Sequence, residues 1–210
     1  MSPTEWYAEV RTWQQGIAAL IGFTGLMIAS LWNFRLNRRR DTALRDEEIK
    51  SVAAALYGEI RHLRVRVATV ARAVANVHIA NGTGRHTIKF DEHFVEAYRM
   101  PEPTLYKALA SKFGLLPADL LIPIAVCYAH VLEVASWLPK MADHPTRAYS
   151  YSPLEVLNPA HAAVTKIAPT LVKIERLIGV PTDATVEPPD LGQAEAVIEM
   201  EEEWRRITAE

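Results

Sequence analysis

The sequence predicts an all-α protein in which one membrane-spanning helix precedes a cytoplasmic helical bundle. Three observations support this fold class. The run from Thr12 to Phe34 has no charged residue, and residues 41–80 contain no proline and a single glycine. Further along the chain, apolar residues recur at intervals of three and four, the spacing of one helix face.

The first element is a transmembrane helix over residues 13–34, after a short external N terminus, residues 1–12. At about 1.5 Å per residue the uncharged run gives a helix of roughly 35 Å, enough to cross a hydrocarbon core of about 30 Å. Trp13 and Trp32 stand at its two ends. Indole rings favour the headgroup boundary, so the two residues mark the interfaces.

Four arginines follow the span directly: Arg35, Arg38, Arg39 and Arg40. Arginines beside a span resist translocation, which predicts an uncleaved anchor with its N terminus outside and everything after residue 40 in the cytoplasm. The same side chains could also bind anionic lipid, at about 1 kcal/mol each. Topology alone is a sufficient explanation for them.

Small residues line one face of the span: Ala18, Gly22, Gly25 and Ala29. Such a face lets two helices approach closely and makes the span a candidate for self-association as a homodimer. Glycine and alanine are common in membrane helices, so ordinary composition is the alternative.

The 170 residues that follow residue 40 are a normal length for one domain. The whole chain holds 23 basic and 25 acidic residues, which is no footprint for nucleic acid. Its basic residues gather near the span and its acidic residues in the tail. Cys127 is the single cysteine, which excludes an internal disulfide; its apolar surroundings predict packing rather than reactivity.

Residues 41–80 predict one long helix, ended by the glycines at 82 and 84. Its apolar residues follow a 3.5-residue repeat without a miss: Ile49, Ala53, Leu56, Ile60, Leu63, Val67, Val70, Val74 and Val77. In a parallel dimer, Glu59 would face Arg64 of a partner. The alternative, which the wide apolar surface favours, is packing inside the chain's own bundle, residues 35–180.

Shorter elements follow. Asp91 can cap a helix that runs to about Arg99, and Thr104 starts another toward Gly114. Residues 115–138 are apolar enough for a second span, but Asp119, Pro123 and Glu133 favour a helix buried all round in a soluble bundle.

A turn-rich loop, residues 139–157, precedes a predicted helix in which Asn158 is the cap and Pro159 the first residue. Pro169 should kink this helix and Gly179 should end it. Residues 181–190 form a linker to an acidic amphipathic helix over residues 191–210. One stripe of that helix is apolar, and it is a candidate partner-binding surface: Val197, Met200, Trp204 and Ile207.

No catalytic, cofactor-binding or metal-binding constellation is evident. Glu59 and His62 have the Glu-x-x-His spacing of di-iron bundles, but such a site needs a second copy and two further glutamates, and His62 lies between arginines. We therefore predict no cofactor and no metal. An enzymatic or ligand-binding alternative would place a pocket between helices near His93, Tyr98, Tyr106 and His130.

Two stretches resemble a group of uncharacterised bacterial single-span membrane proteins. The first joins Leu31–Arg40 to Ala55–Ile60; the second runs from Leu105 through Phe113–Pro117 to Tyr128. The resemblance covers about the first two-thirds of the chain. It implies the bacterial inner membrane as the location, and it carries over no activity and no site residue.

The leading hypothesis is a non-enzymatic, membrane-tethered interaction or scaffold module whose protein partner the sequence does not name. Its support is the anchor, the heptad-like helix and the missing catalytic constellation. Two alternatives stay open: the ligand-binding or enzymatic bundle, and a membrane-active effector in which residues 115–138 insert into the bilayer.

Overall fold

The computed structural model describes residues 3–82, 90–142, 151–180 and 189–209, and every regular element in these ranges is a helix. The prediction of an all-α protein is confirmed. The chain divides into two compact units, residues 1–48 and residues 49–210. Each unit is described by itself below.

The first helix, α1, runs from Pro3 to Gly82. The structure joins the predicted span, 13–34, and the predicted long helix, 41–80, in one helix that begins ten residues before the span and passes through the arginines without a break. Residues 35–40 contain neither glycine nor proline, and arginine and leucine are good helix formers, so nothing in this stretch ends a helix. Pro3 suits a first turn because its missing N–H has no helical acceptor there.

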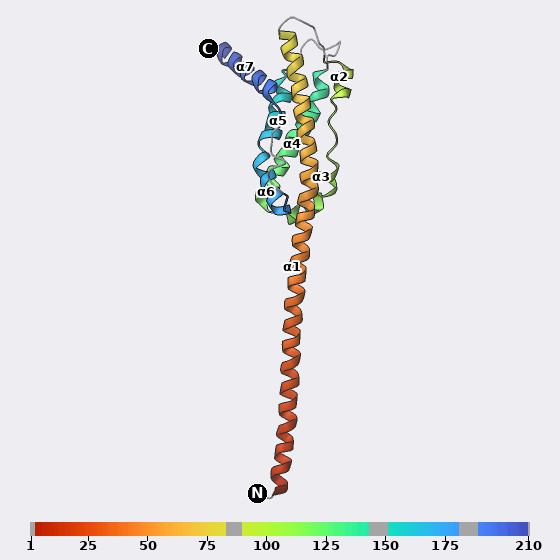
Figure 1. The fold of residues 1–210 in the computed structure, drawn as a ribbon, viewed down its shortest axis with the longest axis vertical. Coiled ribbons are helices and arrows are strands. Elements are labelled where there is room, and N and C mark those ends of the chain that lie inside the picture. Colours follow the sequence, from red (N-terminus) through yellow and green to blue (C-terminus); the bar gives the residue numbers. More distant parts are fainter. Residues whose placement is uncertain (1–2, 83–89, 143–150, 181–188, 210) are drawn as a thin grey trace. The chain divides into compact units, whose positions relative to one another are not determined.

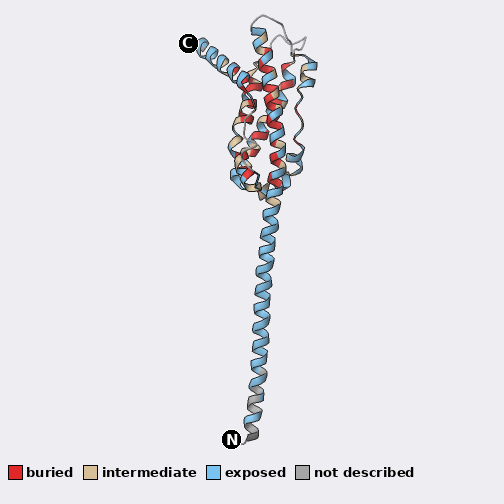
Figure 2. Cartoon of the chain, in the orientation of Figure 1, coloured by how far each residue is buried: buried red, intermediate tan, exposed pale blue. Residues whose placement is uncertain are grey.

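In the first unit, the described side chains of α1 up to residue 47 are exposed (Figure 2). The helix is long and apolar enough here to cross a membrane. Large apolar side chains are exposed around it, at Ile17, Leu20, Phe23, Leu26 and Leu31 among others. In water such a surface would be unfavourable, because it leaves apolar area hydrated along several turns.

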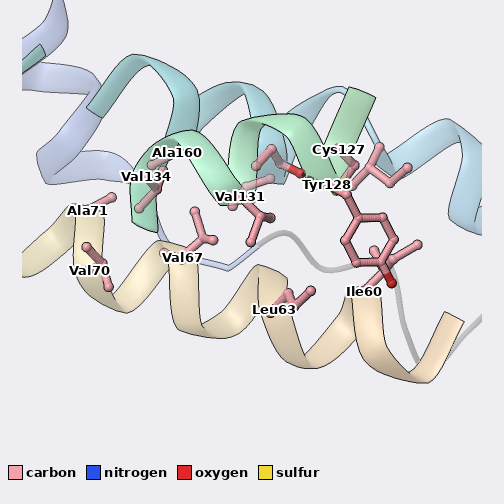
Figure 3. Packing of buried hydrophobic residues seen from close by; sticks show 14 of the residues in the cluster. Ile60, Leu63, Val67, Val70, Ala71, Cys127, Tyr128, Val131, Val134 and Ala160 are labelled. Carbon is pink, nitrogen blue, oxygen red and sulfur yellow. Dashed lines mark hydrogen bonds between the residues drawn. The ribbon is translucent and has the colours of Figure 1, made fainter. Parts of the chain in front are cut away.

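The second unit has one continuous hydrophobic core, to which α1 contributes from residue 49 onward. Against this part of α1 lie α4 (Ala118–Met141), α5 (Leu154–Thr165) and α6 (Ala168–Ile178) (Figure 1). Figure 3 shows Leu63 and Val67 of α1 beside Val131 and Val134 of α4, with Ala160 of α5 closing the layer.

The heptad-like residues of α1 supply this core. Eight of the nine are buried, and Ile49 packs at the edge of the cluster. They share this cluster with residues of α4, α5 and α6. The buried face of α1 is narrower than the apolar surface that its sequence offers, because Ala54 and Val65 are exposed.

Two short helices, α2 (Glu92–Ala97) and α3 (Thr104–Ala108), and a 3-10 turn, η1 (Ala110–Leu115), line the same unit. Asp91 caps α2 as expected, with its Oδ1 accepting a hydrogen bond from the Phe94 N–H at 2.7 Å. The helix ends at Ala97, two residues before the predicted end.

The prediction that residues 115–138 form an all-round buried helix is wrong. One face of α4 packs into the core through residues such as Ile124, Val131 and Leu138. The opposite face leaves Ile122, Val126 and Leu132 exposed. The helix is therefore buried on one side only.

The predicted start at Asn158 is also wrong, because α5 begins at Leu154 and holds Pro159 inside it. Ser152 provides the start, since its Oγ accepts a hydrogen bond from the Leu154 N–H at 3.3 Å. Pro159 is the sixth residue of α5, past the first turn, so the helix lacks the hydrogen bond that an N–H at this position would donate to the Glu155 carbonyl.

Pro169 breaks the following helix rather than kinking it: α5 ends at Thr165 and α6 starts at Ala168. Gly179 ends α6 as predicted, in the left-handed conformation with φ of 76° that favours glycine. The last helix, α7, runs from Gly192 to Ala209. Most of the predicted linker, residues 181–188, and residues 83–84 and 143–150 lie outside the described residues.

Candidate interaction surface on the C-terminal helix

The start of α7 is fixed by local hydrogen bonds. Asp190 accepts through its Oδ1 from the Gly192 N–H at 3.0 Å, and the Glu195 N–H donates to the Leu191 carbonyl at 2.9 Å. The Glu195 carboxylate also lies in the first turn, where it interacts favourably with the positive end of the helix dipole.

The first half of α7 is docked on the bundle. Leu191, Ala194 and Val197 are buried in the common core. Two ion pairs flank them: His161 Nε2 lies 3.4 Å from Glu195 Oε1, and His78 Nε2 lies 3.2 Å from Glu201 Oε1. The helix is therefore held through both its apolar and its acidic faces.

The second half of α7 extends past the residues that bury the first half (Figures 1 and 2). Met200, Trp204 and Ile207 are 50, 66 and 67 % exposed. These three side chains are called the distal stripe below. The predicted stripe is thus divided: Val197 belongs to the core, and the distal stripe faces solvent.

Charged side chains surround the distal stripe. At about 100° per residue, Glu199 and Glu203 flank it on one side, and Glu202 lies on the opposite face of the helix; all three are exposed. Arg205 and Arg206 follow near the end of the helix. An apolar stripe with an acidic flank on a helix is the arrangement by which helices bind apolar grooves. A groove with basic residues at its edge would complement these charges.

The residues predicted for the membrane contact all lie in the first unit. Trp13 and Trp32 are exposed, as are the four arginines Arg35, Arg38, Arg39 and Arg40. The small residues Ala18, Gly22, Gly25 and Ala29 are exposed too, with open space beside both glycines. This unit therefore presents the surface that a span needs.

Glu59 links α1 to α3 and α4 through hydrogen bonds and is not placed as a metal ligand. Its Oε1 accepts from the Leu105 N–H at 2.8 Å, and its Oε2 accepts from the Tyr106 N–H at 2.9 Å and from the Tyr128 hydroxyl at 2.6 Å. It is the N-terminal cap of α3, supplied by another helix. In the described part of the chain, no group of three or more His, Cys, Asp or Glu side chains could hold a metal ion.

The four residues of the predicted pocket are not joined to one another. Tyr98 contacts Phe94, while Tyr106 stacks on Tyr128 with ring centroids 4.0 Å apart. His130 lies beside Glu133 at 3.5 Å, and His93 is exposed. Aromatic packing surrounds Tyr106, and within the described residues no hydrogen bond, ion pair or ring contact connects any two of the four.

Arg64 is a residue whose place the sequence did not reveal. In a parallel dimer the sequence would place it opposite Glu59 of a partner, but it is buried, and its Nε and Nη2 donate to the Val164 carbonyl at 3.1 and 2.9 Å. This carbonyl lies just before the break that Pro169 causes, where helical acceptors lose their donors. Burial lowers the pKa of the guanidinium from its usual value.

Cys127 makes a similar contact with α5. Its Sγ donates to the Ala163 carbonyl at 3.6 Å, and burial raises the pKa of the thiol to about 12. Arg64 and Cys127, from α1 and α4, thus supply donors to two successive carbonyls of α5. In the sequence, only Pro169 points to this contact. It predicts backbone carbonyls that lack helical donors, but it does not indicate which side chains reach them.

Cys127 is expected to resist alkylation in the folded protein. A thiol with a pKa of about 12 is almost fully protonated at pH 8, and only the thiolate reacts. Iodoacetamide labelling followed by mass spectrometry should therefore be slow without denaturant and fast in its presence. Rapid labelling of the native protein would contradict the buried position.

Comparison of the chain with protein-family models, with curated proteins and with solved structures finds no match.

Proposed function

We propose that this protein is a membrane-tethered interaction module that presents the distal stripe of α7 to a protein partner in the cytoplasm. The observation that carries the proposal is the exposure of Met200, Trp204 and Ile207 on one side of a helix whose other half is docked. Tryptophan and methionine are enriched at the centres of protein interfaces. Three large apolar side chains together on one exposed helix face are unusual on a free surface.

The tether in this proposal is the span over residues 13–34, oriented with its N terminus outside. Its support is the length and apolar character of the first unit and the arginines that follow it. The resemblance to bacterial single-span proteins favours the inner membrane. Tethering would restrict the module to two dimensions and raise its local concentration near other membrane proteins.

The partner that fits best has an apolar groove with a basic edge. Glu199 and Glu203 beside the stripe would favour lysine or arginine on the other side and would disfavour an anionic surface. The acidic flank also makes the stripe a poor candidate for binding anionic lipid.

The experiment is site-specific photo-crosslinking in membranes with the full chain. A photoreactive residue replaces Trp204, and a second variant carries it at Glu202, which is exposed on the opposite face of the same helix turn. We expect a discrete adduct from position 204 and none from position 202. Adducts of equal yield at both positions, or none at either, would contradict the proposal.

Two tagged versions of the chain expressed together identify the adduct. A product that contains both tags would mean that a second copy occupies the stripe, which contradicts capture of a different protein. A product with one tag and an added mass supports it. In the supporting case, Met200→Ala should lower the adduct yield, whereas Gln193→Ala, exposed in the docked half of the same helix, should not.

A further inference from the structure

The segment between α2 and α3 lies along α1 and is fixed at both of its ends. At one end Glu59 accepts the N–H groups of Leu105 and Tyr106. At the other end Arg66 Nη2 donates to the Arg99 carbonyl at 3.3 Å. The order of these contacts shows that the segment runs antiparallel to α1, so His62 lies between the two attachments.

The middle of this segment leaves a hollow against the helix. The hollow has a volume of about 510 Å³ and is open to solvent. Its lining is His62, Arg66, Arg99, Met100, Pro101 and Glu102. We call it the 62–102 groove. Its volume is in the range of sites that hold small organic molecules.

Positive charge dominates the groove. Arg66 and Arg99 carry permanent charges, and His62 adds a third group that can be protonated. Within the described residues, Arg66 uses one of its five N–H donors in the bond to Arg99, and the Arg99 side chain makes no hydrogen bond. Several guanidinium donors are therefore left for a ligand.

The one carboxylate in the lining, that of Glu102, is paired with a lysine. Glu102 accepts a hydrogen bond from Lys107 Nζ, and this bond lowers the pKa of the carboxyl group below its usual value. Its negative charge is matched by the positive charge of Lys107, so it does not cancel the two arginines. The two arginines thus supply the positive charge that balances an anion of charge −2.

The groove is also preformed. Pro101 lines it and Pro103 follows, and each proline fixes its own φ and restricts the residue before it. Met100 is buried and forms an apolar floor. A ligand would therefore meet a backbone that is already ordered and would lose less entropy than on a flexible loop.

We propose that the 62–102 groove binds a phosphate group carried by a small molecule or a lipid headgroup, with Arg66 and Arg99 as the anion-binding residues and His62 as a third donor. Guanidinium groups offer paired N–H donors that match phosphate oxygens, and a phosphate monoester carries the charge that the groove balances. The site is independent of α7 and of the partner proposed for it.

The test follows the modification of His62 by diethylpyrocarbonate, which mass spectrometry resolves residue by residue. The full chain is placed in nanodiscs of phosphatidylcholine. In one arm pyrophosphate is added, and in the other the nanodiscs contain phosphatidic acid, whose headgroup is a phosphate monoester. His93, which is exposed and lies outside the groove, is the reference in the same sample.

We expect at least one of the two probes to slow the modification of His62 relative to His93 by about threefold or more, because a bound anion covers the ring. Slowing by pyrophosphate assigns a soluble ligand, and slowing by phosphatidic acid alone assigns a headgroup. Either outcome supports the proposal. No slowing in either arm would overturn it.

Three variants test whether the protection of His62 comes from a defined site or from the general positive charge of the surface. Arg66→Gln and Arg99→Gln should each raise the probe concentration that gives half-maximal protection by about fivefold, the loss of one charge-assisted contact near the surface. Arg99→Gln removes no hydrogen bond within the described residues, so it leaves the fold intact even if Arg66→Gln does not. Arg72→Gln, exposed on the same helix outside the groove, should keep the protection; its loss there as well would overturn the proposal.

Discussion

Replacing Leu56 by alanine is expected to lower the free energy of unfolding of the second unit by about 3 kcal/mol. Leu56 has no exposed surface and lies in the common core. The change removes buried apolar area and leaves a cavity that helices packed on several sides cannot close. Urea unfolding of the full chain in detergent, followed by far-ultraviolet circular dichroism, measures the loss.

The matched control is Val65→Ala on the same helix, where the side chain is 57 % exposed. It should change the free energy by less than about 0.5 kcal/mol. The effect of Leu56→Ala should also be the same at all protein concentrations, since its contacts lie within one chain. A midpoint that rises with concentration would mean instead that the heptad-like residues join two chains.

Glu59→Ala is expected to cost about 3 kcal/mol, although it removes only a polar side chain. Three donors lose their acceptor: the Leu105 and Tyr106 N–H groups and the Tyr128 hydroxyl. The hydroxyl is the costly one because Tyr128 is buried, and burial also raises the pKa of its hydroxyl, so it stays a donor at every pH at which the protein is studied.

Glu59→Gln should cost about half as much, since one oxygen remains to accept from the backbone. Tyr128→Phe gives the second control. In the wild type it should cost about 1 kcal/mol, and in the Glu59→Ala background clearly less, because its acceptor is already gone. Strictly additive losses would contradict the hydrogen bond between the two side chains.

The fold class was predictable because it depends on local signals. The 3.5-residue repeat of α1, the Asp91 cap and the glycine at 179 each act within a few residues of themselves, and the structure has the corresponding features. Boundaries were less predictable where two signals compete. Pro159 suits a helix start, but Ser152 and Pro153 offer an earlier one, and the longer helix buries more apolar surface.

The candidate surface was predictable only in part. The spacing of Val197, Met200, Trp204 and Ile207 defines an apolar stripe whether or not anything covers it. Which of these residues are buried and which are exposed depends on where the bundle ends. That end is set by α5 and by His78 and His161. The 62–102 groove was not predictable, because Arg66 and Arg99 are 33 residues apart and meet only through the fold.

The sequence by itself determined the helical character of this protein, the apolar segment that suits a membrane and the residues of α1 that enter a core, since each follows from periodicity, length and charge along a continuous segment. Only the tertiary structure decided the burial of Arg64, the capping of α3 by Glu59, the exposed face of α4 and the exposure of the distal stripe. These features depend on which elements meet. A side chain on a helix has the same sequence neighbours whether water or another helix covers it, and its energy differs by several kcal/mol between the two.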